Sequence, residues 1–178
     1  MSLNFAAIDF ETADEKKDSA CALSIVIVID GAVSEQLSYL IRPPRPYIIY
    51  SYIHNIYWSD VAEKPVFGDI WPKLIPKLRK IKFFAAHNAP FDRSVLHACC
   101  SKASLNPPSI PFICTVQLAR KIWGIYPTKL PDVCRRLKID LNHHDASSDA
   151  MACAKIVLSA HNSNTLYPYL NAKARTLI

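Results

Sequence analysis

The chain has 178 residues, of which 51% are hydrophobic and 20% charged, and its net charge is +6. This composition predicts one soluble globular domain with a sizeable core and excludes a disordered chain. No apolar run reaches the roughly 18 residues that a membrane span requires. The amino terminus has no basic segment followed by an apolar one. We therefore expect no membrane association, no signal peptide and a cytoplasmic location.

The cysteines and the positive charge restrict the class of site only slightly. None of the six cysteines forms a C-x-x-C pair and most lie in apolar segments, which favours reduced core thiols over a zinc site or disulfides. The surplus of 21 Lys and Arg over 15 Asp and Glu favours a polyanionic partner without proving one. The densest run of positive charge is Lys73, Lys77, Arg79, Lys80 and Lys82. This run is explained equally well by a solvated helix face and by a phosphate-binding patch.

The first part of the chain predicts three strands. Residues 4–11 and 22–29 are runs of strand length, and Asp30-Gly31 after the second run is a strong hairpin-turn signal. Residues 33–41 return as a third strand, which the prolines of 42–46 end because proline cannot donate to a sheet ladder. Residues 47–66 lack a clean periodicity, so we expect a long functional loop or short helical turns there.

From residue 67 the apolar spacing becomes helical. Asp69 is the expected cap, Pro72 then falls in the first turn, and Pro76 should kink the helix. One face of this helix should be buried, namely Phe67, Ile70, Trp71, Leu74, Ile75 and Leu78. A short buried strand is expected at 82–86. The helix after it should begin at the cap Asn88 and bury Phe91, Val95, Leu96 and Cys99.

The remaining elements continue this alternation. A strand is expected at 112–114, helices at 115–123 and 130–137, and a last helix to about residue 160, capped by Asp145 or Ser147. Three hairpin strands followed by alternating strands and helices predict an α/β fold, with a mixed sheet between helices.

The expected division of the chain is one domain over residues 1–161. The C-terminal tail, residues 162–178, carries no clear structural signal. The sequence contains no internal repeat, low-complexity segment or further domain boundary.

Two carboxylates end the first predicted strand. Asp9 and Glu11 are separated by one residue, so both side chains point to the same side of the strand, roughly 6–7 Å apart. Such a pair could hold divalent metals about 3.5–4 Å apart, the spacing of two-metal phosphoryl chemistry. Acids at a strand end are also often only solvated, so the pair alone leaves both interpretations open.

Other polar candidates lie at two predicted helix starts. Asp92 lies four residues past the expected cap of its helix, just after a buried strand, where α/β proteins usually place ligands, although an acid there also suits the helix dipole. The start of the last helix carries His143, His144, Asp145 and Asp149. A histidine and an acid there could reach one metal site. Adjacent histidines are, however, often only surface residues, and capping alone explains Asp145.

Together, these three segments resemble the motifs of the DEDDh (DnaQ-like) 3′→5′ exonuclease family, which includes the proofreading epsilon subunit of bacterial DNA polymerase III and stand-alone homologues. They are Ile8-Asp-Phe-Glu-Thr12, His87-Asn-Ala-Pro-Phe-Asp92 and His144-Asp-Ala-Ser-Ser-Asp-Ala150. The third segment matches H-x-A-x-x-D-A at every fixed position, and its spacing selects His144 rather than His143. Residues 114–120 are similar to the family's helix before the third motif. Residues 52–56 are similar to its I-H-G-I segment, with Asn55 in place of the usual glycine.

The resemblance implies a ribonuclease H-like α/β fold with a five-stranded mixed sheet flanked by helices. The implied reaction is hydrolysis of the last phosphodiester at a 3′ end, releasing a nucleoside 5′-monophosphate. Asp9 would bridge two Mg²⁺ or Mn²⁺ ions. Glu11 and Asp149 would complete the ion that binds the attacking water, and Asp92 would serve the other ion through water. His144 would take the water's proton.

The resemblance also implies contacts with the substrate, a nucleic acid with a free 3′ end. His54 would hydrogen-bond the terminal nucleotide, and the backbone around Thr12 is also well placed. Phe10 is the candidate for stacking, although it points opposite to Asp9 along the strand and so also suits the core. A polymerase or repair complex is a further expected partner, and the sequence sets no oligomeric state.

Three alternatives stay open beside an exonuclease that favours single-stranded DNA. One is an RNA-directed exonuclease of the same fold, which only matched DNA and RNA assays separate. Another is a non-catalytic nucleic-acid-binding or polymerase-associated module, which the retention of all five chemical residues disfavours. The last is a phosphodiesterase for small nucleotides, which would use the same site.

Overall fold

The computed structural model describes residues 2–142 and 145–175. Within them the chain forms a five-stranded sheet in the order β3-β2-β1-β4-β5. β2 is antiparallel to both β1 and β3, whereas β1 with β4 and β4 with β5 are parallel pairs. The strands are β1 (Phe5–Thr12), β2 (Ala20–Ile29), β3 (Ala32–Leu40), β4 (Phe84–Ala86) and β5 (Phe112–Cys114). The predicted mixed sheet is therefore confirmed.

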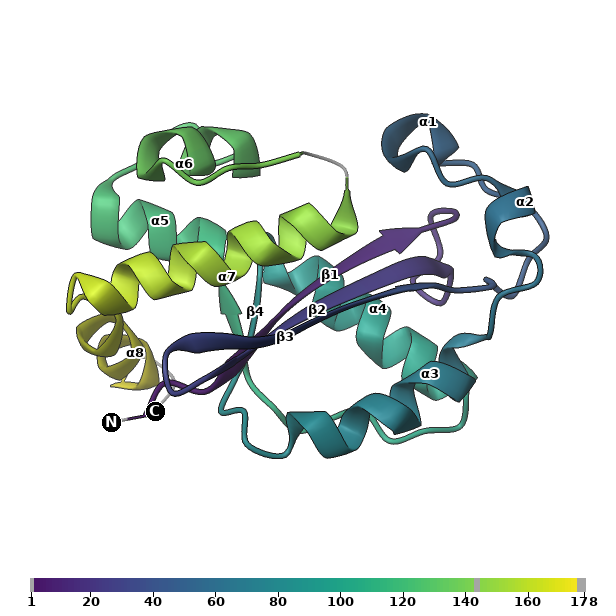
Figure 1. The fold of residues 1–178 in the computed structure, drawn as a ribbon, viewed down its shortest axis with the longest axis horizontal. Coiled ribbons are helices and arrows are strands. Elements are labelled where there is room, and N and C mark those ends of the chain that lie inside the picture. Colours follow the sequence, from purple (N-terminus) through teal and green to yellow (C-terminus); the bar gives the residue numbers. More distant parts are fainter. Residues whose placement is uncertain (1, 143–144, 176–178) are drawn as a thin grey trace.

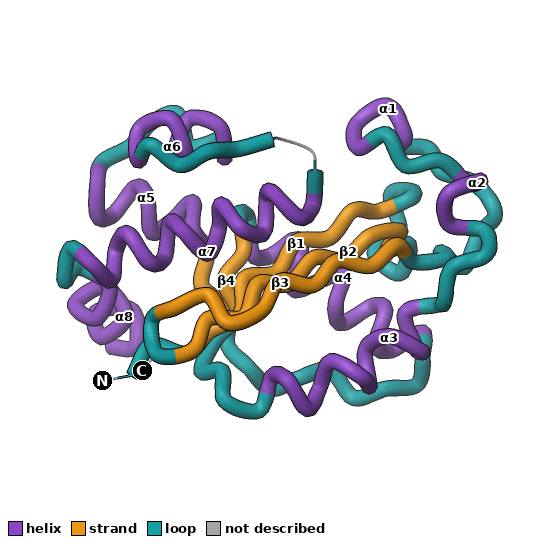
Figure 2. The backbone as a smooth tube through the Cα atoms, in the orientation of Figure 1, coloured by secondary structure: helices purple, strands orange, loops and turns teal. Residues whose placement is uncertain are grey.

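Helices cover both faces of this sheet (Figure 1). On one side lie α5 (Thr115–Trp123), α6 (Leu130–Leu137), α7 (Ala146–Asn162) and α8 (Leu166–Arg175). On the other lie α3 (Phe67–Leu74), the 3-10 turn η1 (Ile75–Leu78) and α4 (Ala89–Lys102). Two short helices, α1 (Ser51–His54) and α2 (Trp58–Val61), interrupt the long connection beyond the carboxyl end of β1 (Figure 2).

The alternation of β1 divides the core into two clusters. Phe5 and Ala7 join the cluster under α7, and Ile8 and Phe10 join the cluster with α3 and α4. Because successive strand residues face opposite sides, Asp9 and Glu11 continue the α7 side of β1. The polar end of the strand thus opens toward the start of α7.

The first three strands and the hairpin are confirmed, with β2 starting two residues before the expected position. Asp30 and Gly31 both have positive φ, 52° and 77°, as the tight turn between β2 and β3 requires. β4 begins at Phe84, two residues later than expected. Helical turns occupy part of the region 47–66, in agreement with one of its two predicted forms.

The predicted start of α3 was wrong. Its N-cap is Val66, so Asp69 lies within the first turn and Pro72 lies inside the helix rather than in its first turn. Ile75 is 47% exposed and not part of the buried face. The predicted interruption at Pro76 is confirmed, because the α-helix ends at Leu74 and the chain tightens into η1. Proline lacks the amide hydrogen that would continue the helix.

The later helices largely match their predicted bounds. Asn88 is the N-cap of α4, but its φ of 72° is left-handed and its side chain makes no capping bond. The Asp145 side chain does cap α7, accepting from the Ser147 amide at 3.2 Å. The segment after residue 161 contains α8, whose Leu166 is fully buried, although its sequence had given no clear signal.

All six cysteines are free and buried, which places them in the core as expected. Among residues 2–142 and 145–175, no helix has both the length and the apolarity to cross a membrane.

Candidate active site

β1 presents Asp9 and Glu11 at its carboxyl end. Both are half-buried, whereas Ile8, Phe10 and Thr12 between and beside them are buried. Asp9 lies opposite Ser24 of β2 and Glu11 opposite Ala22, and the strand register breaks just after Glu11. The two carboxylates therefore stand on one side of the strand, with small β2 side chains beside them.

α4 brings Asp92 to the same strand end. β1 pairs with β4 only through Ala6 and Ala7, and β4 ends at Ala86. Past that point the Asp92 carboxylate takes the place of a strand partner, because its Oδ1 accepts a hydrogen bond from the Phe10 amide at 3.1 Å. A buried amide that would otherwise lack a partner thus fixes a carboxylate that is itself only 2% exposed.

α7 contributes Asp149 from its first turn, and Asp145 caps the same helix. Asp149 is 6% exposed. Both acids are close enough to Glu11 to raise the pKa of its carboxyl group. Segments far apart in the sequence thus deliver the predicted acids to one place.

The carboxylates repel one another strongly. Burial, followed by the charges of Asp92, Glu11 and Asp149, raises the pKa of Asp9 well above its usual range. Burial and the same α7 acids raise the pKa of Glu11 to about 7. Burial raises the pKa of Asp92 to about 8, although the hydrogen bond from Phe10 and the charge of Lys17 act in the opposite direction. Bound cations would relieve this repulsion.

The donor set fits hard divalent cations such as Mg²⁺ and Mn²⁺, which prefer carboxylate oxygens. Within residues 2–142 and 145–175, no three His, Cys, Asp or Glu side chains already enclose one ion. The electrostatic coupling nevertheless links Asp9 to Glu11, Asp92 and Asp149. These four acids are the residues that would hold metal.

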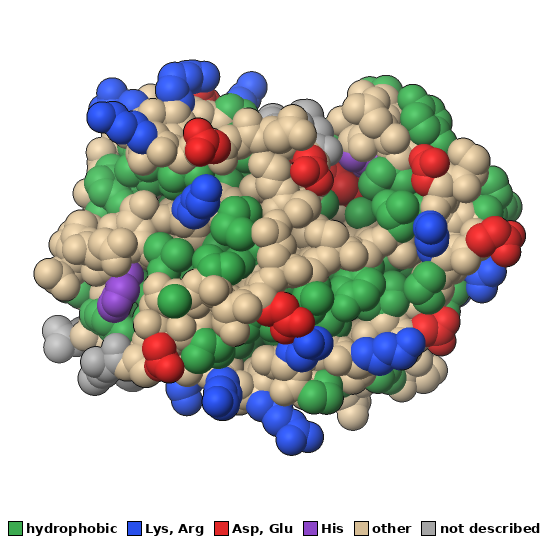
Figure 3. Space-filling view, viewed as in Figure 1, with side chains coloured by type: hydrophobic (Ala, Val, Ile, Leu, Met, Phe, Trp, Pro, Cys, Tyr) green, Lys and Arg blue, Asp and Glu red, His purple; other side chains and the backbone are tan. Residues whose placement is uncertain are grey.

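A cavity of about 440 Å³ adjoins Glu11. One wall comes from the α1 region and includes His54, and the opposite wall includes Asp145 at the start of α7. Its floor is formed by small β-strand residues, among them Ala22, Ser24 and Ser38. Figure 3 shows this hollow between the α1 region and the start of α7, with acidic and histidine side chains inside it.

His54 lines that cavity but is tied to the protein. The Ile56 amide donates to its Nδ1 at 3.1 Å, so Nδ1 is unprotonated. Nε2 then carries the hydrogen and donates to the Thr12 carbonyl at 3.2 Å. A hydrogen bond from His54 to a nucleotide would have to replace one of these bonds. The predicted contact stays a prediction, and the observed bonds show how His54 attaches α1 to the end of β1.

The predicted stacking role of Phe10 does not match its position. Its side chain is 4% exposed and lies in the core, with its ring centroid 6.4 Å from that of Phe67. The reason is the strand alternation, which turns Phe10 away from the face that carries Asp9. Its contribution to the site is the amide that positions Asp92.

The predicted general base, His144, lies outside the described residues, as does His143. The described chain resumes at Asp145, one residue later, which caps α7 beside the cavity.

A family model described as "Exonuclease" matches residues 6–157, which include every described candidate acid. The chain belongs to this exonuclease family. The match starts within β1 and ends within α7, so it spans the whole sheet of the exonuclease domain.

Relatives of the exonuclease domain agree with this assignment. Exodeoxyribonuclease 10 of Escherichia coli K12 is 34% identical over 151 residues, which are 80% of this chain and 62% of that protein. A PolC-type DNA polymerase III of Thermotoga petrophila is 27% identical over 86% of this chain and 12% of its own length. The solved structure of exonuclease X with 5′-overhanging duplex DNA has a TM-score of 0.72 at 29% identity, covering 89% of this chain and 92% of that one. The ribonuclease H-like fold is thereby confirmed.

Three residues near the acids had no expected part in the chemistry, because Lys17 and Cys153 lie outside the motifs and Asp145 was expected only as a cap. The charge of Lys17, whose Nζ lies 4.2 Å from the centre of the Phe91 ring, partly opposes the rise in the pKa of Asp92. Asp145 adds negative charge beside Glu11 in addition to capping α7. Cys153 of α7 is buried so close to Asp9 and Asp92 that their charges raise its pKa further than burial alone. Only the three-dimensional arrangement brings these groups to the site.

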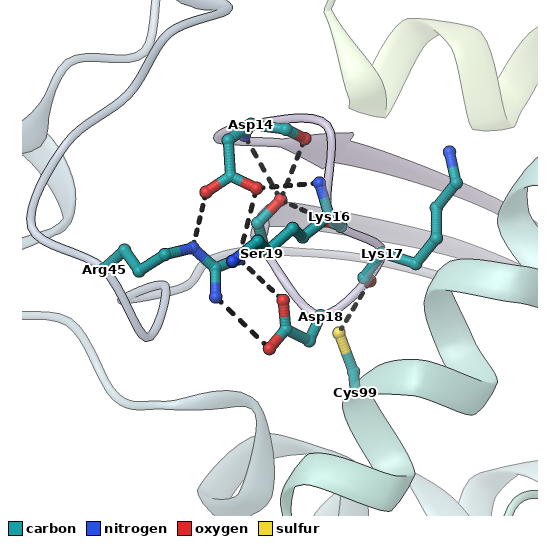
Figure 4. Close-up of polar contacts among 7 residues, drawn as sticks. All are labelled: Asp14, Lys16, Lys17, Asp18, Ser19, Arg45 and Cys99. Carbon is teal, nitrogen blue, oxygen red and sulfur yellow. Dashed lines mark hydrogen bonds and ion pairs between the residues drawn. The ribbon is translucent and has the colours of Figure 1, made fainter.

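An ion-pair network supports the loop that follows β1 (Figure 4). The Arg45 guanidinium donates to both oxygens of Asp14, at 2.6 and 3.1 Å, and to both oxygens of Asp18, at 2.6 and 3.3 Å. The carbonyl of Ala13 accepts the Ile49 amide at 2.6 Å. The network therefore fixes the loop after β1 to the segment that leads into α1 and His54.

Replacing Arg45 by Ala should lower the free energy of unfolding by about 1–3 kcal/mol at pH 7, because the charged partners are largely buried. Burial raises the pKa of Asp14, but the hydrogen bonds from Arg45 outweigh it and lower the pKa overall. Hydrogen bonds from Arg45 also lower the pKa of Asp18. The stabilisation is therefore present above the usual aspartate pKa of about 4 and lost below it.

Urea unfolding at pH 7 and near pH 3 measures both effects. Arg135→Ala is the matched control, since the Arg135 side chain in its pair with Asp132 is 74% exposed and its loss should cost less than about 1 kcal/mol. An Arg45→Ala defect of the same size at both pH values would contradict the role given to the pair of aspartates.

Proposed function

We propose that this chain is a metal-dependent 3′→5′ exonuclease, which hydrolyses the last phosphodiester of a nucleic acid and releases nucleoside 5′-monophosphates. The observation that carries the proposal is the meeting of Asp9, Glu11, Asp92 and Asp149 at the carboxyl ends of β1 and β4 and the start of α7. Burial and mutual repulsion raise the pKa values of Asp9, Glu11 and Asp92, which indicates a site built for positive charge.

Each acid has a distinct position in the proposed reaction. Asp9 lies centrally, coupled to all three others, and is the residue to bridge two cations. Glu11, which lines the cavity, and Asp149, whose charge raises the pKa of Glu11, would together hold the ion that binds the attacking water. Asp92, fixed by the Phe10 amide, would serve the other ion, on the side of the leaving oxygen. Two Mg²⁺ or Mn²⁺ ions at such a site supply activation of water and stabilisation of the leaving 3′ oxygen. His144 is the proposed acceptor of the water's proton.

DNA is the favoured substrate, with single strands preferred. The likeness to Exodeoxyribonuclease 10 and to an exonuclease solved with 5′-overhanging duplex DNA supports DNA as the substrate, and the preference for single strands is an expectation from the sequence. The PolC-type relative supports work beside a polymerase or repair complex. The chain corresponds to 62% of the length of its E. coli relative, so these assignments of substrate and partner are proposed for the exonuclease domain.

The polarity of the reaction can be tested with chemically blocked ends. A single-stranded oligonucleotide with a 3′ hydroxyl should shorten stepwise, while the same oligonucleotide with a 3′ phosphate should be resistant or much slower. The reason is that the terminal nucleotide must enter the cavity of about 440 Å³ that Glu11 lines. Cleavage of a closed circular single strand would show an endonuclease and overturn the proposal.

A further inference from the structure

A groove at the carboxyl end of β4 has no part in the proposed chemistry. Its volume is about 670 Å³. It is bordered by the turn after β4, which leads into α4 and Asp92, and by the connection between α5 and α6. Its lining includes His87, Asn88, Arg120, Tyr126, Thr128 and Lys129. Since Asn88 is the N-cap of the helix whose first turn holds Asp92, the groove borders the Asp92 side of the active site.

Hydrogen bonds fix the outer wall of this groove to the sheet. His87 lies with Nδ1 2.8 Å from the Thr115 hydroxyl and Nε2 2.9 Å from the Thr128 carbonyl. Arg120 Nε donates to the Thr128 hydroxyl at 2.9 Å, and the guanidinium carbon lies 5.4 Å from the centre of the Tyr126 ring. The Tyr126 residue is 70% exposed. The wall thus presents an open aromatic ring beside a held positive charge.

The surrounding surface is strongly basic. Residues 120–138 contain six Lys and Arg and one Asp, a surplus of five in a chain whose net charge is +6. All six of these basic residues are exposed. The other basic run, 73–82, lies at the opposite end of the sheet, because the Lys82 amide donates to the Asn4 carbonyl just before β1. Of the two runs, only 120–138 contributes basic residues to the groove, namely Arg120 and Lys129.

The proposed chemistry gives the direction in which a bound strand must run. The leaving 3′ oxygen belongs to the next nucleotide of the strand, so that nucleotide lies on the side of Asp92. The terminal nucleotide lies on the side of Glu11, where the cavity with His54 is found. The rest of the strand therefore leaves the site past the start of α4, toward the groove.

We propose that this groove binds the part of a single-stranded polynucleotide on the 5′ side of the scissile phosphate, with a base stacked on Tyr126 and a phosphate against Lys129. The inference rests on the proposed function and deepens it by assigning the path of the strand. Stacking on an aromatic ring and lysine–phosphate contacts are both tolerant of sequence. The groove should therefore add affinity with strand length and little sequence preference.

The test compares binding with turnover in the same variants. Binding of a 5′-labelled oligo-dT of about twelve nucleotides is measured in EDTA over a range of salt concentrations. Tyr126→Ala should weaken binding about tenfold, and Tyr126→Phe should restore most of it because the ring is kept. Lys129→Ala should reduce the slope of log affinity against log salt by roughly 0.7, the value for one phosphate of a single strand. The matched control Lys80→Ala removes the same charge from the distant basic run and should change neither quantity.

Turnover separates this inference from the proposed function. The p-nitrophenyl ester of thymidine 5′-monophosphate has no upstream nucleotide, so wild type and both Ala variants should hydrolyse it equally with Mn²⁺. On the oligonucleotide the Ala variants should show a raised KM. An unchanged affinity and salt slope in both Ala variants would overturn the groove assignment even if wild type is a good exonuclease. A wild type inactive on both substrates would overturn the proposed function, while the binding measurement would still decide the groove.

Discussion

Replacing Asp9 by Asn should abolish measurable turnover and, in metal-free protein at pH 8, raise the free energy of unfolding by about 1–3 kcal/mol. Both effects have the same cause. Asp9 is the acid that burial and three neighbouring carboxylates force toward a proton, so its charge is costly in the folded state without a cation. The amide keeps the shape of the side chain and removes that charge.

The pH dependence follows from the sign of these shifts. The folded-state pKa values of Asp9, Glu11 and Asp92 are raised, so protonation favours the folded state. Metal-free wild type should therefore lose stability from about pH 5 to pH 8, and the Asn variant should lose less. Mn²⁺ should raise the Tm of wild type more than that of the variant, because a ligand stabilises only the state that binds it.

Thermal unfolding in EDTA between pH 5 and pH 8, repeated with Mn²⁺, gives all of these quantities. Asp69→Asn is the control, since Asp69 is exposed on α3 and its replacement changes the net charge equally. Retained turnover in Asp9→Asn would contradict the proposal that Asp9 bridges two metal ions. A variant less stable than wild type at pH 8 would contradict the repulsion described for the site.

His144→Ala should lose about 10²–10⁴-fold in single-turnover rate, the usual worth of general-base catalysis, while still binding Mn²⁺ through the four acids. His143→Ala should stay within a few-fold of wild type. Both histidines could titrate near pH 6.5, so their chemistry alone does not choose between them. The spacing of the third motif, which places its histidine five residues before Asp149, selects His144.

Single-turnover rates at saturating Mn²⁺ measure the difference between the two histidines. Asp145→Ala is the companion variant, because it removes the capping bond to Ser147 and should cost about 0.5–2 kcal/mol of stability. A crippled His143→Ala beside a normal His144→Ala would mean that the third motif is aligned one residue out.

The sequence predicted β1 well because two signals coincide there. The apolar alternation places Ile8 and Phe10 inside, and the same period places Asp9 and Glu11 together on the other side. The stacking role of Phe10 failed for that very reason. The family pattern selected the residue, whereas the strand period turns it into the core.

Features that depend on contacts between distant segments could not be predicted. The Phe10 amide finds Asp92 only because β4 ends at Ala86, and no local pattern encodes this distance. The prediction that Asp69 caps α3 was wrong. A capping signal is local, whereas the packing of Phe67 against Trp71 extends the helix back to Phe67. Likewise Tyr126 became a candidate only when the structure placed it beside Arg120 and the carboxyl end of β4.

Metal-dependent removal of nucleotides from a 3′ end is the reaction proposed for the four acids of this site. It can be measured by digesting 5′-labelled single-stranded DNA, duplex DNA and RNA with Mn²⁺, with and without EDTA. We expect a ladder of labelled products that shortens with time, release of nucleoside 5′-monophosphates, single-stranded DNA degraded fastest, and no reaction in EDTA. Full activity in the chelated sample, or release of the label within internal fragments from the first time point, would contradict it.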